Sequence, residues 1–152
     1  MANTYTQIYV QIVFAVKGRE NLIHEKHREK LEKYICGIVN NKESKPLAIY
    51  CNPDHLHILI GLKSNTSVSD ITRDIKANSS KWINEKKFIV GKFSWQEGYG
   101  AFTYAKSQID AVAKYIHNQP QHHQKKSFKE EYLAILNKAE IEFEEKYLFE
   151  WY

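Results

Sequence analysis

The feature of the sequence that most restricts its fold is a hairpin predicted near the middle of the chain. Residues 47–51 favour a strand, Asn52-Pro53-Asp54 is typical of a tight turn, and residues 55–62 favour a second strand. Two strands joined by so short a turn can pair only in the antiparallel direction. The hairpin therefore predicts an antiparallel sheet.

The second strand of this hairpin carries two histidines on one face. Side chains alternate along a strand, so His55 and His57 project together. The intervening aliphatic side chains point to the opposite face, where we expect a core: Leu56, Ile58 and Ile60. Two neighbouring imidazoles on a rigid strand are a suitable pair of metal ligands.

Segments with strand or helix periodicity flank the hairpin on both sides. Alternation of apolar and polar residues predicts strands, and apolar residues at helical spacing predict helices. The expected elements are a strand at 4–16, a helix at about 24–40, a helix from the N-cap Ser67 to about Lys87, and a strand at 93–104 interrupted near Gly98 and Gly100.

The element order β-α-β-β-α-β predicts an α+β fold of the ferredoxin-like type, an antiparallel sheet with two helices on one face. We expect the other face to be open and to present the histidines. Added C-terminal helices are predicted at about 107–119, which carries a tyrosine, and from Ser127 to about Lys138. Residues 1–152 are expected to form a single domain, with an acidic, aromatic tail at about 139–152 that docks or frays.

Charge and composition narrow the class of partner. The net charge is +4, but residues 139–152 contain five Glu and one Lys, so the remainder of the chain is distinctly basic. A basic body suits a polyanion such as nucleic acid. Cys36 and Cys51 are too few for a disulfide framework, and neither a signal peptide nor a membrane span is evident. These features predict a soluble cytoplasmic protein that does not contact a membrane.

A tyrosine and a glutamine in the first added helix are the other candidate functional residues. Tyr115 and Gln119 are four residues apart and share a helix face. A helical tyrosine alone is usually packing, and a His-x-His pair alone is usually structural. Together, a phenol, two imidazoles and an amide oxygen suit phosphoryl transfer assisted by a cation. We also expect Gln119 at a helix C-terminus, where the helix dipole favours a cation.

These residues resemble a known family. His55-Leu56-His57 resembles the HUH motif, two histidines around a hydrophobic residue, and the segment from Tyr115 to Gln119 resembles the tyrosine motif of the single-tyrosine transposases. Those enzymes belong to the smallest insertion sequences, the insertion-sequence-two-hundred type. The resemblance covers nearly the whole chain and includes residues 95–99 and 118–123.

The resemblance implies a metal-dependent transposase that acts on single-stranded DNA. Tyr115 would be the nucleophile and would form a 5′-phosphotyrosine link, while His55, His57 and Gln119 would bind one Mg²⁺ or Mn²⁺. Rejoining would reverse the attack, so no nucleotide cofactor is implied. Members of the family are homodimers that recognise hairpin ends, and the tyrosine helix can complete the partner's site. Such a helix would swing on the segments near Gly98 and Lys106.

The implied metal ligands and the basic residues lead to two further expectations. Two imidazoles and an amide are neutral, so we expect weak Mg²⁺ binding without DNA and a preference for Mn²⁺. Basic side chains around the second predicted helix are candidate phosphate contacts, although each also suits an ordinary surface: Lys63, Arg73, Lys76 and Lys81. Ser79 and Ser80 are expected on the same outer face.

Several alternatives remain open from the sequence. His122 or His123 could bind the metal or a phosphate, and Cys51 could join the paired histidines in a zinc site that lacks an obvious fourth ligand. Tyr99 and Tyr104 are rival nucleophiles, but neither has a glutamine four residues later. The alternative functions are a domesticated nuclease of chromosomal repeats and a non-catalytic single-strand-binding module. A two-histidine phosphoesterase would need a second His-x-Thr/Ser motif, which the sequence lacks.

Overall fold

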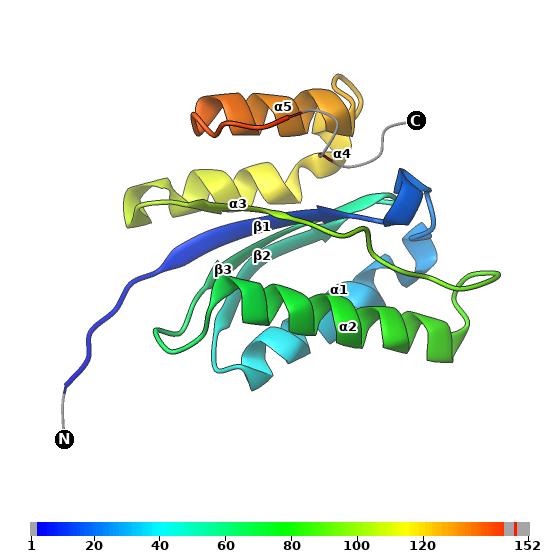
Figure 1. The fold of residues 1–152 in the computed structure, drawn as a ribbon, viewed down its shortest axis with the longest axis horizontal. Coiled ribbons are helices and arrows are strands. Elements are labelled where there is room, and N and C mark those ends of the chain that lie inside the picture. The colour runs from blue at the N-terminus through cyan, green and yellow to red at the C-terminus, as the bar shows by residue number, and fades with distance from the viewer. Residues whose placement is uncertain (1–2, 145–147, 149–152) are drawn as a thin grey trace.

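The computed structural model describes residues 3–144 and Leu148 and is built on an antiparallel sheet (Figure 1). The strands are β1 (Tyr9–Ala15), β2 (Lys45–Cys51), β3 (His55–Gly61) and β4 (Gly100–Thr103). The helices are α1 (Glu25–Asn41), α2 (Val68–Lys86), α3 (Ile109–His117), α4 (Gln119–His122) and α5 (Phe128–Lys138), with 3-10 turns at Lys17–Arg19 and Lys106–Gln108.

The strand order is β2-β3-β1-β4, and all three pairings are antiparallel. The first strand therefore lies inside the sheet, between β3 and β4. The predicted hairpin is confirmed: Cys51 pairs with Leu56, and the Asn52 N–H donates to the His55 carbonyl at 2.8 Å. With α1 and α2 as its two crossover helices, the sheet has the ferredoxin-like arrangement that the element order predicted.

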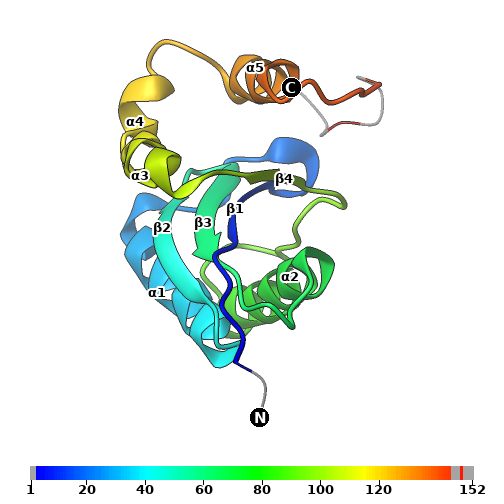
Figure 2. The ribbon, with the colours of Figure 1, turned by 90° about the vertical axis from the view of Figure 1, so that its left-hand side faces the viewer.

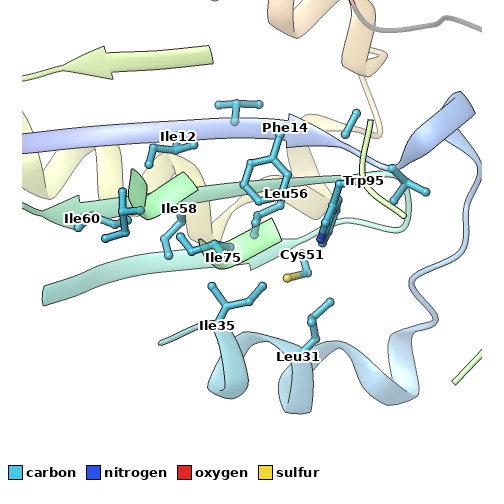
Figure 3. Close-up of a cluster of buried hydrophobic side chains, with 14 of the residues drawn as sticks. Ile12, Phe14, Leu31, Ile35, Cys51, Leu56, Ile58, Ile60, Ile75 and Trp95 are labelled. Carbon is cyan, nitrogen blue, oxygen red and sulfur yellow. The ribbon is translucent and has the colours of Figure 1, made fainter. Parts of the chain in front are cut away.

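Helices α1 and α2 cover one face of the sheet, and the main core lies between these layers (Figures 1 and 3). The alternation of the strands accounts for this core, because every second side chain of β1 and β3 points toward the helices. Figure 3 shows side chains from strands and helices meeting there: Ile12, Phe14, Leu31, Ile35, Cys51, Leu56, Ile58, Ile60, Ile75 and Trp95.

The other face of the sheet is covered, so the prediction of an open face is wrong. Helix α3 packs on β2 and β3, and α4 and α5 lie on the same side (Figure 2). The cause is a second apolar patch on that face, where Ala48 and Leu59 are buried against Ile116 of α3. An amphipathic helix must bury its apolar stripe, and this patch offers the complementary surface.

The helix predicted at 107–119 is divided. Helix α3 ends at His117, Asn118 has non-helical angles (φ −95°, ψ 19°), and α4 begins at Gln119. Pro120 has no N–H to donate to the carbonyl of Ile116, which breaks the hydrogen-bond ladder at this point. Gln119 therefore begins a short helix instead of ending a long one, although it directly follows Asn118, the C-cap residue of α3.

The last strand is shorter than the 93–104 that the sequence predicted, and its interruption is confirmed. Trp95 forms an isolated bridge with Val16, and regular pairing resumes only at β4. Gly98 lies between them with a φ of +89°, a conformation that favours glycine.

The remaining elements follow their sequence signals closely. The Ser67 hydroxyl caps α2 by accepting from the Asp70 N–H at 3.0 Å, and the Ser127 hydroxyl caps α5 by accepting from the Glu130 N–H at 3.2 Å. In the tail, Phe143 and Leu148 pack against the main core, whereas residues 145–147 and 149–152 lie outside the described part of the chain. Among the described residues, no helix combines the length and apolar character that a membrane crossing requires.

Candidate metal and nucleophile site

The two histidines of β3 share one face of the strand, as predicted, and both are buried there. His55 is 1% exposed and His57 is 0% exposed, and their ring centroids are 5.3 Å apart. Both Nε2 atoms face the carboxylate of Glu131 from α5, at 3.6 Å from His55 and 3.0 Å from His57. The ring of Phe128 stacks on His55 at 3.8 Å, so α5 covers the pair.

A third histidine joins this pair from the end of α4. The Nε2 atom of His123 lies 3.4 Å from Glu131 Oε1 and 2.9 Å from Gln119 Oε1. The ligand atoms of three histidines and one carboxylate all lie within 4.8 Å of one another: His55, His57, His123 and Glu131. These four residues are called the histidine–glutamate cluster below.

Gln119 lies against the cluster and is fully buried. Its Nε2 donates to Glu131 Oε2 at 3.2 Å, which turns its Oε1 toward the imidazoles. The Asn52 amide donates to that Oε1 at 3.1 Å and to His55 Nε2 at 3.1 Å. The turn that begins β3 and the start of α4 are thus linked, and Gln119 lies beside both predicted histidines.

Two of the three imidazoles are held with Nε2 directed into the cluster. His55 Nδ1 lies 2.7 Å from a carboxylate oxygen of Asp54, and His123 Nδ1 lies 3.0 Å from the carbonyl oxygen of Lys126. Both partners are acceptors, so each Nδ1 carries a proton, and in the neutral imidazole each Nε2 then offers a lone pair. This is the arrangement found around metal-binding histidines.

His57 is held differently. Its Nδ1 lies 3.0 Å from the amide nitrogen of Gln11, whose oxygen accepts from the Tyr104 hydroxyl at 2.8 Å. Nδ1 is therefore the acceptor here, and Nε2–H donates to Glu131. Rotation of the Gln11 amide would present its oxygen instead, move the imidazole proton to Nδ1 and free Nε2 as a ligand atom.

The cluster fits a divalent cation. Neighbouring ligand atoms that share a cation at about 2.0–2.2 Å lie about 3.0–3.5 Å apart. The contacts of Glu131 Oε1 with the three imidazoles, at 3.0, 3.4 and 3.6 Å, fall close to that spacing. Imidazole nitrogens with carboxylate and amide oxygens are ordinary ligands of transition-metal ions. The structure therefore contains a possible metal site.

Tyr115 reaches the same carboxylate from α3. Its hydroxyl donates to Glu131 Oε2, and its ring lies 6.0 Å from the His57 ring and 4.3 Å from the His122 ring. Burial raises the pKa of the phenol, and the negative charge of Glu131 raises it further, so the hydroxyl is protonated in this arrangement. The predicted meeting of histidine strand, tyrosine and glutamine occurs within one chain.

The ionisation of the cluster follows from its contacts. Burial alone would raise the pKa of Glu131, but the surrounding imidazoles of His123, His55 and His57 outweigh this effect and hold that pKa well below its usual range. Burial lowers the pKa of His57. Burial alone would also lower the pKa of His123, but the hydrogen bond to Glu131 and its charge raise it. The cluster therefore contains an ionised carboxylate in a buried setting.

Glu131 is the one member of the cluster that the sequence interpretation missed. Its neighbours Phe128 and Tyr132 are both buried on the inward face of α5. A glutamate three residues after Phe128 shares that inward face, so the available signal was a charged residue within an apolar stripe. His123 was weighed as an alternative ligand, and its Nε2 does lie in the cluster.

The four predicted DNA contacts lie away from the cluster, and each has a partner inside the chain. Lys63 pairs with Glu43, Arg73 with Asp70 and Asp74, and Lys81 with Glu85, while Lys76 donates to the carbonyls of Gln96 and Gly98. Helix α2 lies on the opposite side of the sheet from α3 and α5 (Figure 1). The role of the four basic side chains in binding DNA stays a prediction.

The outer face of α2 differs from the expectation in one residue. Ser79 is 0% exposed and accepts from the Trp95 indole N–H at 2.9 Å, so it belongs to the core. Beside it, Arg73 and Lys76 line a pocket of about 480 Å³ between α2 and residues 94–99.

The rival site residues take other positions. Cys51 is packed in the main core with Leu56, on the face of the sheet away from the histidines, so a zinc site that includes it is ruled out by geometry. Tyr99 lines the pocket beside α2, with its ring 6.0 Å from the Lys76 ammonium. Tyr104 contacts the site through Gln11, whose oxygen accepts from its hydroxyl.

Comparisons with known proteins agree with this fold and with the family predicted from the motifs. Residues 4–119 match the family described as "Transposase IS200 like". A protein of known structure from Deinococcus radiodurans, described as a transposase, is 17% identical, with a TM-score of 0.62, over 78% of this chain and 95% of its own.

A second solved structure, a REP-associated tyrosine transposase bound to a REP hairpin, is 16% identical, with a TM-score of 0.60, over 81% of this chain and 73% of its own. At such identities both structures show a shared fold. No curated protein matches the sequence. The family match spans well over half of the chain, and this protein belongs to the IS200-like transposases.

Proposed function

We propose that this transposase cleaves and rejoins single-stranded DNA through Tyr115, with the help of one divalent cation, Mg²⁺ or Mn²⁺. The observation that carries the proposal is the contact of Tyr115 with Glu131, whose carboxylate also meets the imidazoles of His55 and His57. The side chain of Glu131 therefore links the proposed nucleophile to the possible cation site within one subunit.

In the proposed cleavage, the Tyr115 hydroxyl gives up its proton and its oxygen bonds to the phosphorus of a DNA phosphodiester. The bond from phosphorus to the 3′ oxygen breaks, that oxygen keeps the electron pair and takes up a proton, and a 5′-phosphotyrosine remains. Attack by a 3′-hydroxyl on the phosphotyrosine reverses the step. One phosphodiester replaces another, so no nucleotide cofactor is needed.

His55, His57 and Gln119 are the proposed ligands, and their shared contacts support this assignment. Both imidazoles meet Glu131, and the Asn52 amide donates to His55 and to Gln119. When bound, the cation withdraws charge from a phosphate oxygen and orients the phosphodiester. His55 and His57 lie buried beneath Phe128 and Glu131 of α5.

The proposed partner is single-stranded DNA with hairpin ends, and we propose that the protein works in the cytoplasm as a homodimer. The basic charge of the chain supports a nucleic-acid partner, and the REP hairpin in the second solved structure supports hairpin recognition. Lys63, Arg73, Lys76 and Lys81 remain the proposed phosphate contacts.

A second candidate function is favoured by the similarity to the REP-associated transposase. A domesticated nuclease that cuts hairpins at chromosomal repeats would use the same chemistry on a different DNA. The two candidates differ in the DNA around the gene, because a mobile copy is flanked by its own terminal hairpins.

The test is formation of a covalent protein–DNA adduct. Labelled single-stranded DNA with a hairpin is incubated with the protein and Mn²⁺, and we expect an adduct that resists SDS. Tyr115→Phe should abolish it, whereas Tyr99→Phe, which changes a tyrosine remote from the cluster, should not. An adduct that persists in Tyr115→Phe would place the nucleophile elsewhere. Retention of the DNA without any adduct would favour a binding module.

A further inference from the structure

We propose that Glu131 and His123 are additional ligands of the cation site, and that the second oxygen of Glu131 positions the Tyr115 hydroxyl. The proposal deepens the proposed function and rests on it in assigning Tyr115 as the nucleophile. The family match ends at Gln119, whereas the two ligands proposed here, His123 and Glu131, lie beyond it in the C-terminal segment.

The contacts of Glu131 carry the argument. Its side chain is 5% exposed, and Oε1 lies 3.0 Å from His57 Nε2, 3.4 Å from His123 Nε2 and 3.6 Å from His55 Nε2. Its other oxygen, Oε2, accepts from the Tyr115 hydroxyl and from the Gln119 amide. One carboxylate thus contacts three proposed ligands through one oxygen and the proposed nucleophile through the other.

The position of His123 points the same way. Its Nδ1 donates to the Lys126 carbonyl, so Nε2 of the neutral imidazole presents a lone pair toward Gln119 Oε1 at 2.9 Å. The Gln119 oxygen also has only lone pairs to offer. Two acceptors at that distance need a proton or a cation between them, and a shared cation satisfies both atoms together with Glu131.

The fold holds these two groups in place. Glu131 lies on a regular helix that is capped by Ser127 and anchored by buried residues on either side, including Phe128 stacked on His55. His123 is fixed by its bond to the backbone of Lys126. Ligands on a rigid helix and a braced turn need little reorganisation to bind an ion.

The added ligands change what the site can bind. Two imidazoles and an amide are neutral and rely on DNA phosphate for negative charge. A carboxylate supplies that charge from within the chain, and a third imidazole favours Mn²⁺ and other transition-metal ions over Mg²⁺. The site should therefore bind Mn²⁺ in the absence of DNA.

The experiment measures Mn²⁺ binding to the full chain without DNA, by electron paramagnetic resonance of the free ion. We expect one Mn²⁺ per chain for the wild type and an affinity at least about tenfold weaker for Glu131→Gln and for His123→Ala. Glu131→Asp, which keeps the charge, should restore part of the affinity. Glu130→Gln changes the exposed neighbour on the same helix and should bind as the wild type does.

Equal or tighter Mn²⁺ binding by Glu131→Gln would overturn the proposal, because the carboxylate would then compete with the cation instead of binding it. Circular dichroism shows whether each variant is folded. If Glu131→Gln does not fold, His123→Ala and Glu131→Asp decide the question, since unchanged affinity in both would equally overturn the proposal.

The positioning of Tyr115 is tested separately, by the rate of adduct formation. At saturating Mn²⁺ we expect adduct formation by Glu131→Gln to be slower than in the wild type by about tenfold or more, with partial recovery in Glu131→Asp. An unchanged rate would overturn this part. If the wild type binds Mn²⁺ through Glu131 but forms no adduct, the proposed function is refuted and the ligand assignment stands. If the wild type forms the adduct but the variants bind Mn²⁺ as the wild type does, the ligand assignment is refuted and the proposed function stands.

Discussion

Lys76 is a residue whose environment changes its chemistry. Its ammonium donates to the carbonyls of Gln96 at 2.8 Å and Gly98 at 2.6 Å, and it lies 5.2 Å from the centre of the Phe14 ring. Burial lowers the pKa of Lys76 to about 8. The side chain therefore fastens the segment around Gly98 to α2, in addition to its predicted contact with DNA.

This environment predicts a pH dependence of stability. Between about pH 8 and the ordinary lysine value of 10.5, the unfolded chain binds more protons at Lys76 than the folded chain does. The free energy of unfolding should therefore rise with pH across that window, and the cost of the buried charge is fully present below it. In urea titrations at pH 7.5 and 9.5, the wild type should gain stability relative to Lys76→Met. A difference that stays constant with pH would contradict this prediction.

Single residues also show where sequence reasoning succeeds. Strand alternation was enough to place His55 and His57 on one face, and helical spacing was enough to bring Tyr115 and Gln119 to one end of α3. Glu131 could not be placed in the same way. Its contacts depend on where α5 docks on the sheet, and no local pattern of spacing encodes the position of one element on another.

At the scale of elements, the docking of α5 depends on a close approach to β4. A Cβ atom on Gly100 would lie 2.5 Å from the Tyr132 hydroxyl and 3.0 Å from the Phe102 ring. Both neighbours are buried aromatic side chains with little room to move. Gly100 is therefore the point that allows α5 to lie close to the sheet edge.

We predict that Gly100→Ala displaces α5 and weakens the cluster. The added methyl group would force Tyr132 or Phe102 to shift, at a cost of about 1–3 kcal/mol. The melting temperature should fall, and Mn²⁺ affinity should fall with it because Glu131 precedes Tyr132. Gly61→Ala is the matched control, because Gly61 also lies in a strand and an added Cβ there would make only ordinary contacts, the nearest with Lys45 Cβ at 3.6 Å. Unchanged Mn²⁺ binding by Gly100→Ala would show that α5 does not depend on this contact.

The elements also show which fold predictions failed and why. The hairpin, α1, α2 and α5 carried local signals, namely a turn, N-caps and apolar stripes, and were predicted closely. The break between α3 and α4 came two residues before the expected end, because Pro120 removes a hydrogen bond upstream of itself. The covered face was missed because Ala48 and Leu59 form an apolar patch only after β2 and β3 pair.

At the scale of the whole molecule, the site is assembled from one chain. Tyr115 of α3 contacts Glu131, which contacts His57 of β3, all within the same subunit. The family resemblance implies a dimer in which the tyrosine helix can serve the partner's site. The geometry described here favours cleavage in cis.

A mixing experiment tests this expectation. Tyr115→Phe and His57→Ala are combined, so that a mixed dimer could form an active site only by pairing the tyrosine of one chain with the histidines of the other. We expect no adduct from the mixture, because each site here draws both residues from one chain. An adduct that appears only on mixing would establish cleavage in trans, and light scattering reports whether dimers form at all.

The strand order has a consequence for how the protein is made. Strand β1 is synthesised first but lies between β3 and β4, so the sheet stays incomplete until the ribosome has passed residue 103. Glu131 emerges later still. A nascent chain therefore has the imidazoles of His55 and His57 before it has the carboxylate of Glu131 that joins them, so the centre can assemble only after residue 131 has been synthesised.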